Sequence, residues 1–166
     1  ILGEHMEGPY LNRQYKGAHE ESLLLPPDAA YVTDYLDIMC MITVAPELNR
    51  EFIRWASEKG LIVSMGHSNA TFEEAQSAIE AGASNVTHLF DARTGLHHQR
   101  PGLGGAALLH DAVDAEVIAD TVHLRRELFK LIYRMKGPNR IILITDCTRA
   151  GGMPAGDYQL GALLAH

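Results

Sequence analysis

The feature that most restricts the fold is a regular alternation of short apolar runs with longer stretches of helical periodicity. The apolar runs end near residues 45, 67, 90, 120 and 146, so consecutive ends lie 22 to 30 residues apart. That spacing is typical of successive β/α units, and most runs are apolar throughout, as are parallel strands covered on both faces. The pattern therefore predicts an α/β fold. It leaves open whether the strands close into a barrel or form an open sheet.

Local sequence signals predict where the elements begin and end. Pro46 can start a helix that Gly60 ends, and Thr71-Phe-Glu-Glu74 has the pattern of a capping box before a helix closed by Gly82. We expect strands at Ile1–Glu7, Met39–Ala45, Leu61–Gly66, Asn85–Phe90, Glu116–Asp120 and Arg140–Thr145. We expect further helices at Leu124–Lys136, Pro27–Asp37 and Gly105–His110.

Polar side chains stand at the ends of five predicted strands. They are Glu7, His67, His88, Asp120 and Asp146, and His123 follows shortly after Asp120. Because the carboxyl ends of parallel strands share one edge of a sheet, we expect these side chains to surround one opening. Imidazole and carboxylate are ligands of zinc, iron and cobalt. The pattern predicts a metal site, with Asp146 exchanging a proton with water beside the metal.

Each of these residues, taken alone, has a simpler interpretation. His67 could belong to a turn in which Ser68 or Asn69 caps the next helix. His88 could be a core histidine that is hydrogen-bonded to the backbone. The occurrence of five such residues at five strand ends favours the shared site.

Composition limits the classes of function. The 166 residues carry a net charge of −7, which argues against binding to nucleic acid or to an anionic membrane. No apolar run approaches the roughly 18 residues of a membrane span, and no sequence typical of a signal peptide is present. The two cysteines, Cys40 and Cys147, favour a reducing compartment, so we expect a cytoplasmic protein. The nine histidines support metal or acid–base chemistry.

Short segments occur in an order that resembles a known family. They are Gly3–Tyr10 (GEHMEGPY), Lys16–His19 (KGAH), Val44–Glu47 (VAPE), Gly66–Ala70 (GHSNA), Thr87–Phe90 (THLF), Ile118–Asp120 followed by His123, and Ile144–Asp146. The ordered set resembles the N-acetylglucosamine-6-phosphate deacetylases, metal-dependent members of the amidohydrolase superfamily. The resemblance implies a (β/α)8 TIM barrel with its site at the carboxyl ends of the strands. About six β/α units of such a barrel are present.

The resemblance also implies the reaction and the residue roles. An amino-sugar phosphate would lose its N-acetyl group as acetate. Glu7, His67 and His88 correspond to the metal ligands, for zinc first and otherwise iron, cobalt or manganese. Asp146 corresponds to the acid/base, and His19 and His123 to substrate contacts, with His123 polarising the amide carbonyl. The resemblance further implies a homo-oligomer, which we expect to be a dimer.

Substrate-binding positions depart from the family pattern. Asp91 and Ala92 stand where the family has Asn-Ala, which places a negative charge where a sugar phosphate would approach. Gln99 stands at the position of a phosphate-contacting arginine, with Arg100 beside it. Glutamine cannot form the bidentate cationic contact that arginine forms with phosphate. The catalytic residues are retained, whereas the selectivity for phosphate depends on Arg100.

Two alternatives follow from these observations. Asp91 and Gln99 favour an amidohydrolase that acts on a different N-acyl or cyclic-amide substrate. The length favours a non-catalytic metal-binding fragment, because a complete barrel needs about 250 residues. On either view we expect residues 1–166 to be one partial catalytic barrel domain, without the family's N-terminal strands and small β domain.

Overall fold

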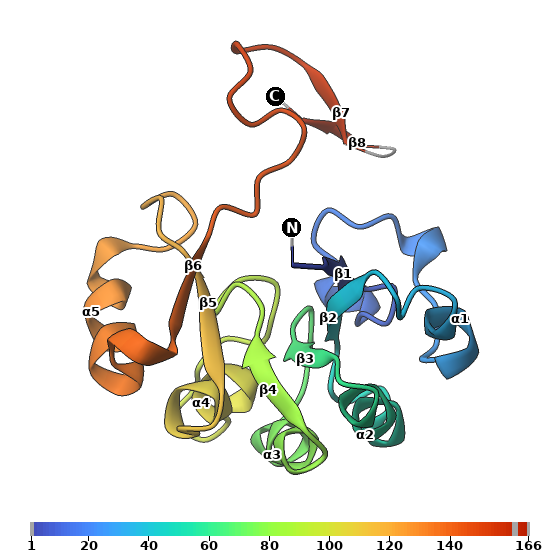
Figure 1. Ribbon diagram of the computed structural model, residues 1–166. Coiled ribbons are helices and arrows are strands. Elements are labelled where there is room, and N and C mark those ends of the chain that lie inside the picture. The colour runs from blue at the N-terminus through green and yellow to red at the C-terminus, as the bar shows by residue number, and fades with distance from the viewer. Residues whose placement is uncertain (1, 161–162, 166) are drawn as a thin grey trace.

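Six parallel strands form one sheet in the order of the sequence. The computed structural model describes residues 2–160 and 163–165, so Ile1 of the first predicted strand lies outside the described residues. The strands are β1 (Glu4–Glu7), β2 (Met39–Val44), β3 (Ile62–Met65), β4 (Ala83–Val86), β5 (Asp114–Ile118) and β6 (Ile141–Ile144). They curve into an arc with the helices on its outer side, as half of a barrel (Figure 1). The predicted α/β class and the six β/α units are confirmed.

The helices cover the outer face of the arc (Figure 1). They are α1 (Ala29–Thr33), α2 (Arg50–Glu58), α3 (Phe72–Glu80), α4 (Gly102–Leu109) and α5 (Arg126–Lys136), with 3-10 turns at Arg13–Tyr15, Glu21–Leu23 and Pro138–Arg140. The predicted capping box is present, because Thr71 Oγ1 accepts from Glu74 N and Glu74 Oε2 accepts from Thr71 N. Among the described residues, none of the helices has the length and apolar character that a membrane crossing requires.

The apolar core lies between the sheet and the helices. Ile42, Val63 and Val86 on the strands are fully buried together with Ile53 of α2 and Leu103 of α4. Burial of such side chains contributes about 1.5–3 kcal/mol each. This core makes the sheet rigid where its carboxyl edge presents the polar residues.

The inner face of the sheet is polar, which the apolar strand pattern did not predict. His5 Nε2 lies 2.7 Å from Thr43 Oγ1, which lies 2.7 Å from Thr87 Oγ1. Thr87 also contacts Ser64 at 2.5 Å, and the amide of Asn85 donates to Ser64 Oγ at 2.9 Å and to Glu116 Oε1 at 3.0 Å. The chain of hydrogen bonds satisfies most of the polar groups buried there, although Asn85 Oδ1 has no partner among the described residues. It links strands β1 to β5 beneath the carboxyl edge.

Strands β4 and β5 both lie earlier in the sequence than predicted. Strand β4 ends at Val86, not at Phe90, because the chain leaves the sheet and reaches the left-handed region at His88, with φ 30°. Strand β5 lies earlier than predicted, so Asp120 follows the strand instead of ending it. His88 and Asp120 therefore lie in loops beyond the ends of β4 and β5.

The starts of several helices also differ from prediction. Helix α2 begins after Asn49, whose side chain accepts from Phe52 N, and not at Pro46. Thr71 caps α3 as its capping box predicts, so the alternative caps Ser68 and Asn69 are excluded. The helix predicted at Pro27–Asp37 is the shorter α1, and that predicted at Gly105–His110 begins earlier, at Gly102. The antiparallel strands β7 (Tyr158–Leu160) and β8 (Leu163–Ala165) were not predicted.

Candidate metal centre and active site

Three of the predicted site residues adopt left-handed backbone conformations directly after their strands. The φ angles are 47° for His67, 30° for His88 and 49° for Asp146. Residues other than glycine rarely adopt this region, and such strain concentrates at functional sites. The conformation turns each chain sharply at the carboxyl edge of the sheet.

The atoms of Glu7, His67 and His88 that could bind a metal lie close to one another. Glu7 Oε1 lies 3.0 Å from His67 Nε2 and 2.9 Å from His88 Nε2, and the two Nε2 atoms are 3.0 Å apart. The three residues come from the ends of β1, β3 and β4. The structure therefore brings together all three residues that were predicted as metal ligands.

This donor set fits a divalent cation. His67 Nδ1 lies 2.7 Å from the carbonyl oxygen of Tyr15, which can only accept, so Nδ1 carries the proton. In a neutral His67, Nε2 then directs a lone pair at Glu7 Oε1, which is also an acceptor. Atoms this close together need a positive charge among them, which either a bound cation or a proton on one of the imidazoles supplies. A histidine fixed in this way through its second nitrogen is the usual arrangement at protein metal sites.

The surroundings keep Glu7 ionised and His67 in place. Burial raises the pKa of Glu7, but the hydrogen bonds and charges of His67 and His88 outweigh this and hold the pKa well below its usual range. A Cβ at Gly66 would lie 2.9 Å from side-chain atoms of Thr43 and Thr87, so the strand before His67 tolerates only glycine there without movement. An ionised carboxylate beside two imidazoles is a ligand set suited to a divalent cation.

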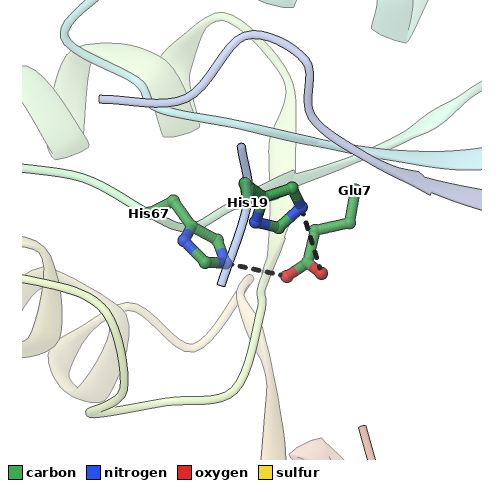
Figure 2. A group of neighbouring side chains, drawn as sticks. All are labelled: Glu7, His19 and His67. Carbon is green, nitrogen blue, oxygen red and sulfur yellow. Dashed lines mark hydrogen bonds and ion pairs between the residues drawn. The ribbon is translucent and has the colours of Figure 1, made fainter. Parts of the chain in front are cut away.

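His19 and Asp146 extend this cluster. His19 Nε2 lies 3.8 Å from Glu7 Oε2 (Figure 2). One possible ligand atom from each of Glu7, His19 and His67 lies within 4.8 Å of those of the other two residues. These three residues and Asp146 line one open cavity of about 340 Å³. His88 Nε2 lies closer to Glu7 than His19 Nε2 does, at 2.9 Å against 3.8 Å. His19 lies where it can contact a molecule in the cavity.

His123 is oriented by Asp120. Asp120 Oδ2 lies 2.7 Å from His123 Nδ1, and Oδ1 accepts from the main-chain N–H of Val122 and His123. These hydrogen bonds lower the pKa of Asp120 to about 2, and the side-chain bond raises the pKa of His123. The raised pKa favours the protonated ring, and because its Nδ1–H is engaged by Asp120, the N–H of Nε2 is the one that a protonated His123 can donate to a bound molecule.

The residues predicted to contact the substrate fall into two groups. Asp91 and Ala92 lie in the β4–α4 loop, where Asp91 N donates to His88 O at 2.9 Å. Within the part of the chain that the structure describes, Asp91 Oδ2 is buried without a hydrogen-bond partner, and burial raises the pKa of Asp91. Gln99 and Arg100 are exposed farther along the same loop. The structure thus places Asp91 beside His88 and leaves Gln99 and Arg100 at the surface.

Sequence reasoning assigned no role to Glu47. Its carboxylate accepts three hydrogen bonds, from Asn12 Nδ2 at 2.8 Å, Ser68 Oγ at 2.7 Å and Asn69 N at 2.7 Å. Asn12 N in turn donates to His67 O at 2.9 Å. Glu47 therefore holds the turn that carries His67. It follows the end of β2 closely, so the rule that located the other site residues could have found it.

Comparisons with known proteins identify the relatives of this chain. No family model matches the chain. It is 42% identical to the N-acetylglucosamine-6-phosphate deacetylase of Lysinibacillus sphaericus, over 100% of this chain and 44% of the relative. The crystal structure of the deacetylase from Thermotoga maritima superposes with a TM-score of 0.93 at 40% identity, covering 98% of this chain and 45% of that one. The chain is homologous to part of the N-acetylglucosamine-6-phosphate deacetylases.

One further structure concerns a ligand. A mutant deacetylase from Mycobacterium smegmatis, in complex with N-acetyl-D-glucosamine-6-phosphate, matches with a TM-score of 0.95 at 35% identity over 99% of this chain and 45% of that chain. The present chain spans less than half the length of each of these three deacetylases. Its half-barrel is therefore a portion of their fold, and that portion contains the converging Glu7, His67 and His88.

Proposed function

We propose that this chain forms the metal-binding part of a hydrolase that removes the N-acetyl group from N-acetylglucosamine-6-phosphate, giving glucosamine-6-phosphate and acetate. The observation that carries the proposal is the convergence of Glu7, His67 and His88 within 3.0 Å, beside a cavity that Asp146 also lines. The homology to deacetylases along the whole chain supports this reaction over other metal-dependent hydrolyses.

Glu7, His67 and His88 would hold the cation, which we propose to be zinc, with iron, cobalt or manganese as substitutes. When bound, such a cation lowers the pKa of water and polarises an amide carbonyl. Asp146 accepts a proton from the attacking water and returns it to the departing amine. His123, oriented by Asp120, donates from Nε2 to the carbonyl oxygen as negative charge develops there.

The substrate would enter the cavity lined by His19 and Asp146. We propose that His19 and the loop residues Asp91 and Ala92 contact the sugar, and that Gln99 and Arg100 lie towards its phosphate. We further propose that residues 1–166 are one partial catalytic barrel domain of a cytoplasmic homodimer. The free thiols of Cys40 and Cys147 support a reducing compartment.

The deciding experiment measures acetate release from N-acetylglucosamine-6-phosphate with added zinc. The unsubstituted protein and Asp37→Asn, an exposed control, should turn over, whereas Asp146→Asn should lose at least about a hundredfold in kcat because it lacks the acid/base. An Asp146→Asn variant as active as the control would show that another group moves the proton. Zinc content equal in Glu7→Ala and the unsubstituted protein would remove Glu7 from the ligand set.

A different N-acyl substrate is the second candidate. It is favoured by the buried, unpartnered oxygen of Asp91 among the described residues and by the neutral side chain of Gln99. Parallel assays with N-acetylglucosamine-6-phosphate and unphosphorylated N-acetylglucosamine separate the two candidates. Equal kcat/KM for both compounds would favour the second candidate.

A further inference from the structure

Arg93 has a fully buried guanidinium whose hydrogen bonds go to the main chain. Its Nη2 donates to the carbonyl oxygens of Thr87 and, at 3.2 Å, His88, and its Nε donates to the carbonyl oxygen of Asp91 at 3.1 Å. Burial lowers the pKa of Arg93 to about 10, so the group is still charged at neutral pH. A buried charge is costly to retain, and the three carbonyl contacts offset part of that cost, while Nη1 is buried without a hydrogen-bond partner among the described residues.

These three carbonyls belong to the turn that presents His88. Within the turn, His88, Phe90 and Ala92 have φ angles of 30°, 83° and 44°. Conformations of this kind persist only where the surroundings hold them. The planar guanidinium, with donors in a fixed fork, can hold several carbonyl oxygens of one turn at once. A lysine could supply the charge but not the fork.

His88 depends on its backbone for orientation more than His67 does. The ring of His67 is fixed at Nδ1 by the carbonyl of Tyr15. The Nδ1 atom of His88 is buried and has no hydrogen-bond partner in residues 2–160 and 163–165. Apart from the contacts of its Nε2 with Glu7 and His67, its ring direction is therefore set by packing and by the turn that Arg93 holds.

The backbone of Arg93 also joins the two histidine turns. Ser68 and Arg93 form a parallel bridge, in which Ser68 N donates to Ala92 O at 3.2 Å and Thr94 N donates to Ser68 O at 3.3 Å. Ser68 directly follows His67 in the chain. The segment that fixes the turn of His88 is thus hydrogen-bonded to the turn of His67.

We propose that Arg93 is a positioning residue for cation binding: its buried guanidinium sets the turn of His88 so that Nε2 faces Glu7 and His67. The inference rests on the proposed function, because it requires that these three residues bind a cation. Arg93 does not line the cavity beside Glu7, so its action is through His88 and not through contact with substrate.

The test compares Arg93→Lys with Arg126→Lys, a control at an arginine whose side chain is 85% exposed. Zinc affinity is measured by competition with a chelator, and the absorption spectrum of the cobalt-loaded protein reports ligand geometry. We expect Arg93→Lys to weaken zinc binding about 10- to 100-fold, as loss of groups that orient metal ligands does, and to change the cobalt spectrum. Arg126→Lys should match the unsubstituted protein in both measurements.

The outcomes separate the inference from the proposed function. If the unsubstituted protein binds no zinc, the proposed function fails and the inference fails with it. If it binds zinc and folded Arg93→Lys keeps the same affinity and cobalt spectrum, only the inference is overturned, even if Arg93→Lys is less stable. If Arg93→Lys does not fold, Arg93→Gln, whose planar amide still donates without burying a charge, is judged by the same two measurements.

Discussion

Replacing Glu47 with alanine should destabilise the fold and weaken the metal site together. The substitution removes an acceptor of three hydrogen bonds, from Asn12, Ser68 and Asn69. Bonds to a charged group contribute about 1.5 kcal/mol or more each. Because the three share one partly exposed carboxylate, they are not additive, and we expect a loss of about 2–3 kcal/mol in the free energy of unfolding.

The effect on the metal site follows from the position of Ser68 and Asn69 directly after His67. Release of their turn should lower zinc affinity about 10- to 100-fold. Urea denaturation measures stability, and chelator competition measures zinc affinity. Glu58→Ala, at the exposed end of α2, is the control. A Glu47→Ala protein that unfolds at the same urea concentration as the control and binds zinc as tightly would refute this reasoning.

Three further predictions concern separate features. Thr71→Ala removes the capping box and should cost about 1 kcal/mol in urea denaturation; an unchanged midpoint would contradict its role in stability. The hydrogen bond to Asp120 raises the pKa of His123. The stability that this bond gives to the fold should therefore be complete below the ordinary histidine pKa and be lost as pH rises through the raised pKa. NMR titration should show a lower His123 pKa in Asp120→Asn, and an unshifted midpoint would exclude the pair as the cause. Gly66→Ala should lower both thermal stability and zinc affinity, because the new Cβ must displace its neighbours; unchanged values would show that the strand can yield.

The fold was predictable to the extent that it depends on local pattern. Strand β2 and helix α3 have strong signals, an apolar run and a capping box, and both were located closely. The end of β4 at Val86 was not located, because Thr87 is β-branched and Leu89 is apolar, as residues of a strand commonly are. The left-handed turn at His88 ends the strand there, and contacts between residues far apart in sequence hold that turn, such as the hydrogen bond from Leu89 N to Glu116 O of β5.

The same distinction applies to the site. Glu7, His67 and His88 could be predicted because their residue types suit a metal and the rule of strand ends gathers them at one edge. The same rule could have located Glu47, which follows β2, but it does not give the role of Glu47 or locate Arg93. The partners of Glu47 lie in other loops, and those of Arg93 are main-chain carbonyls, which every residue type carries.

By itself, the sequence determined that this is an α/β chain with metal-binding residue types at the ends of its strands, because β/α spacing and strand polarity are properties of local order along the chain. The tertiary structure alone decided that three donor atoms come within 3.0 Å, and which charges hold the histidine turns. Those outcomes depend on left-handed backbone angles and on hydrogen bonds between segments tens of residues apart, and distances of that kind exist only after the sheet has formed.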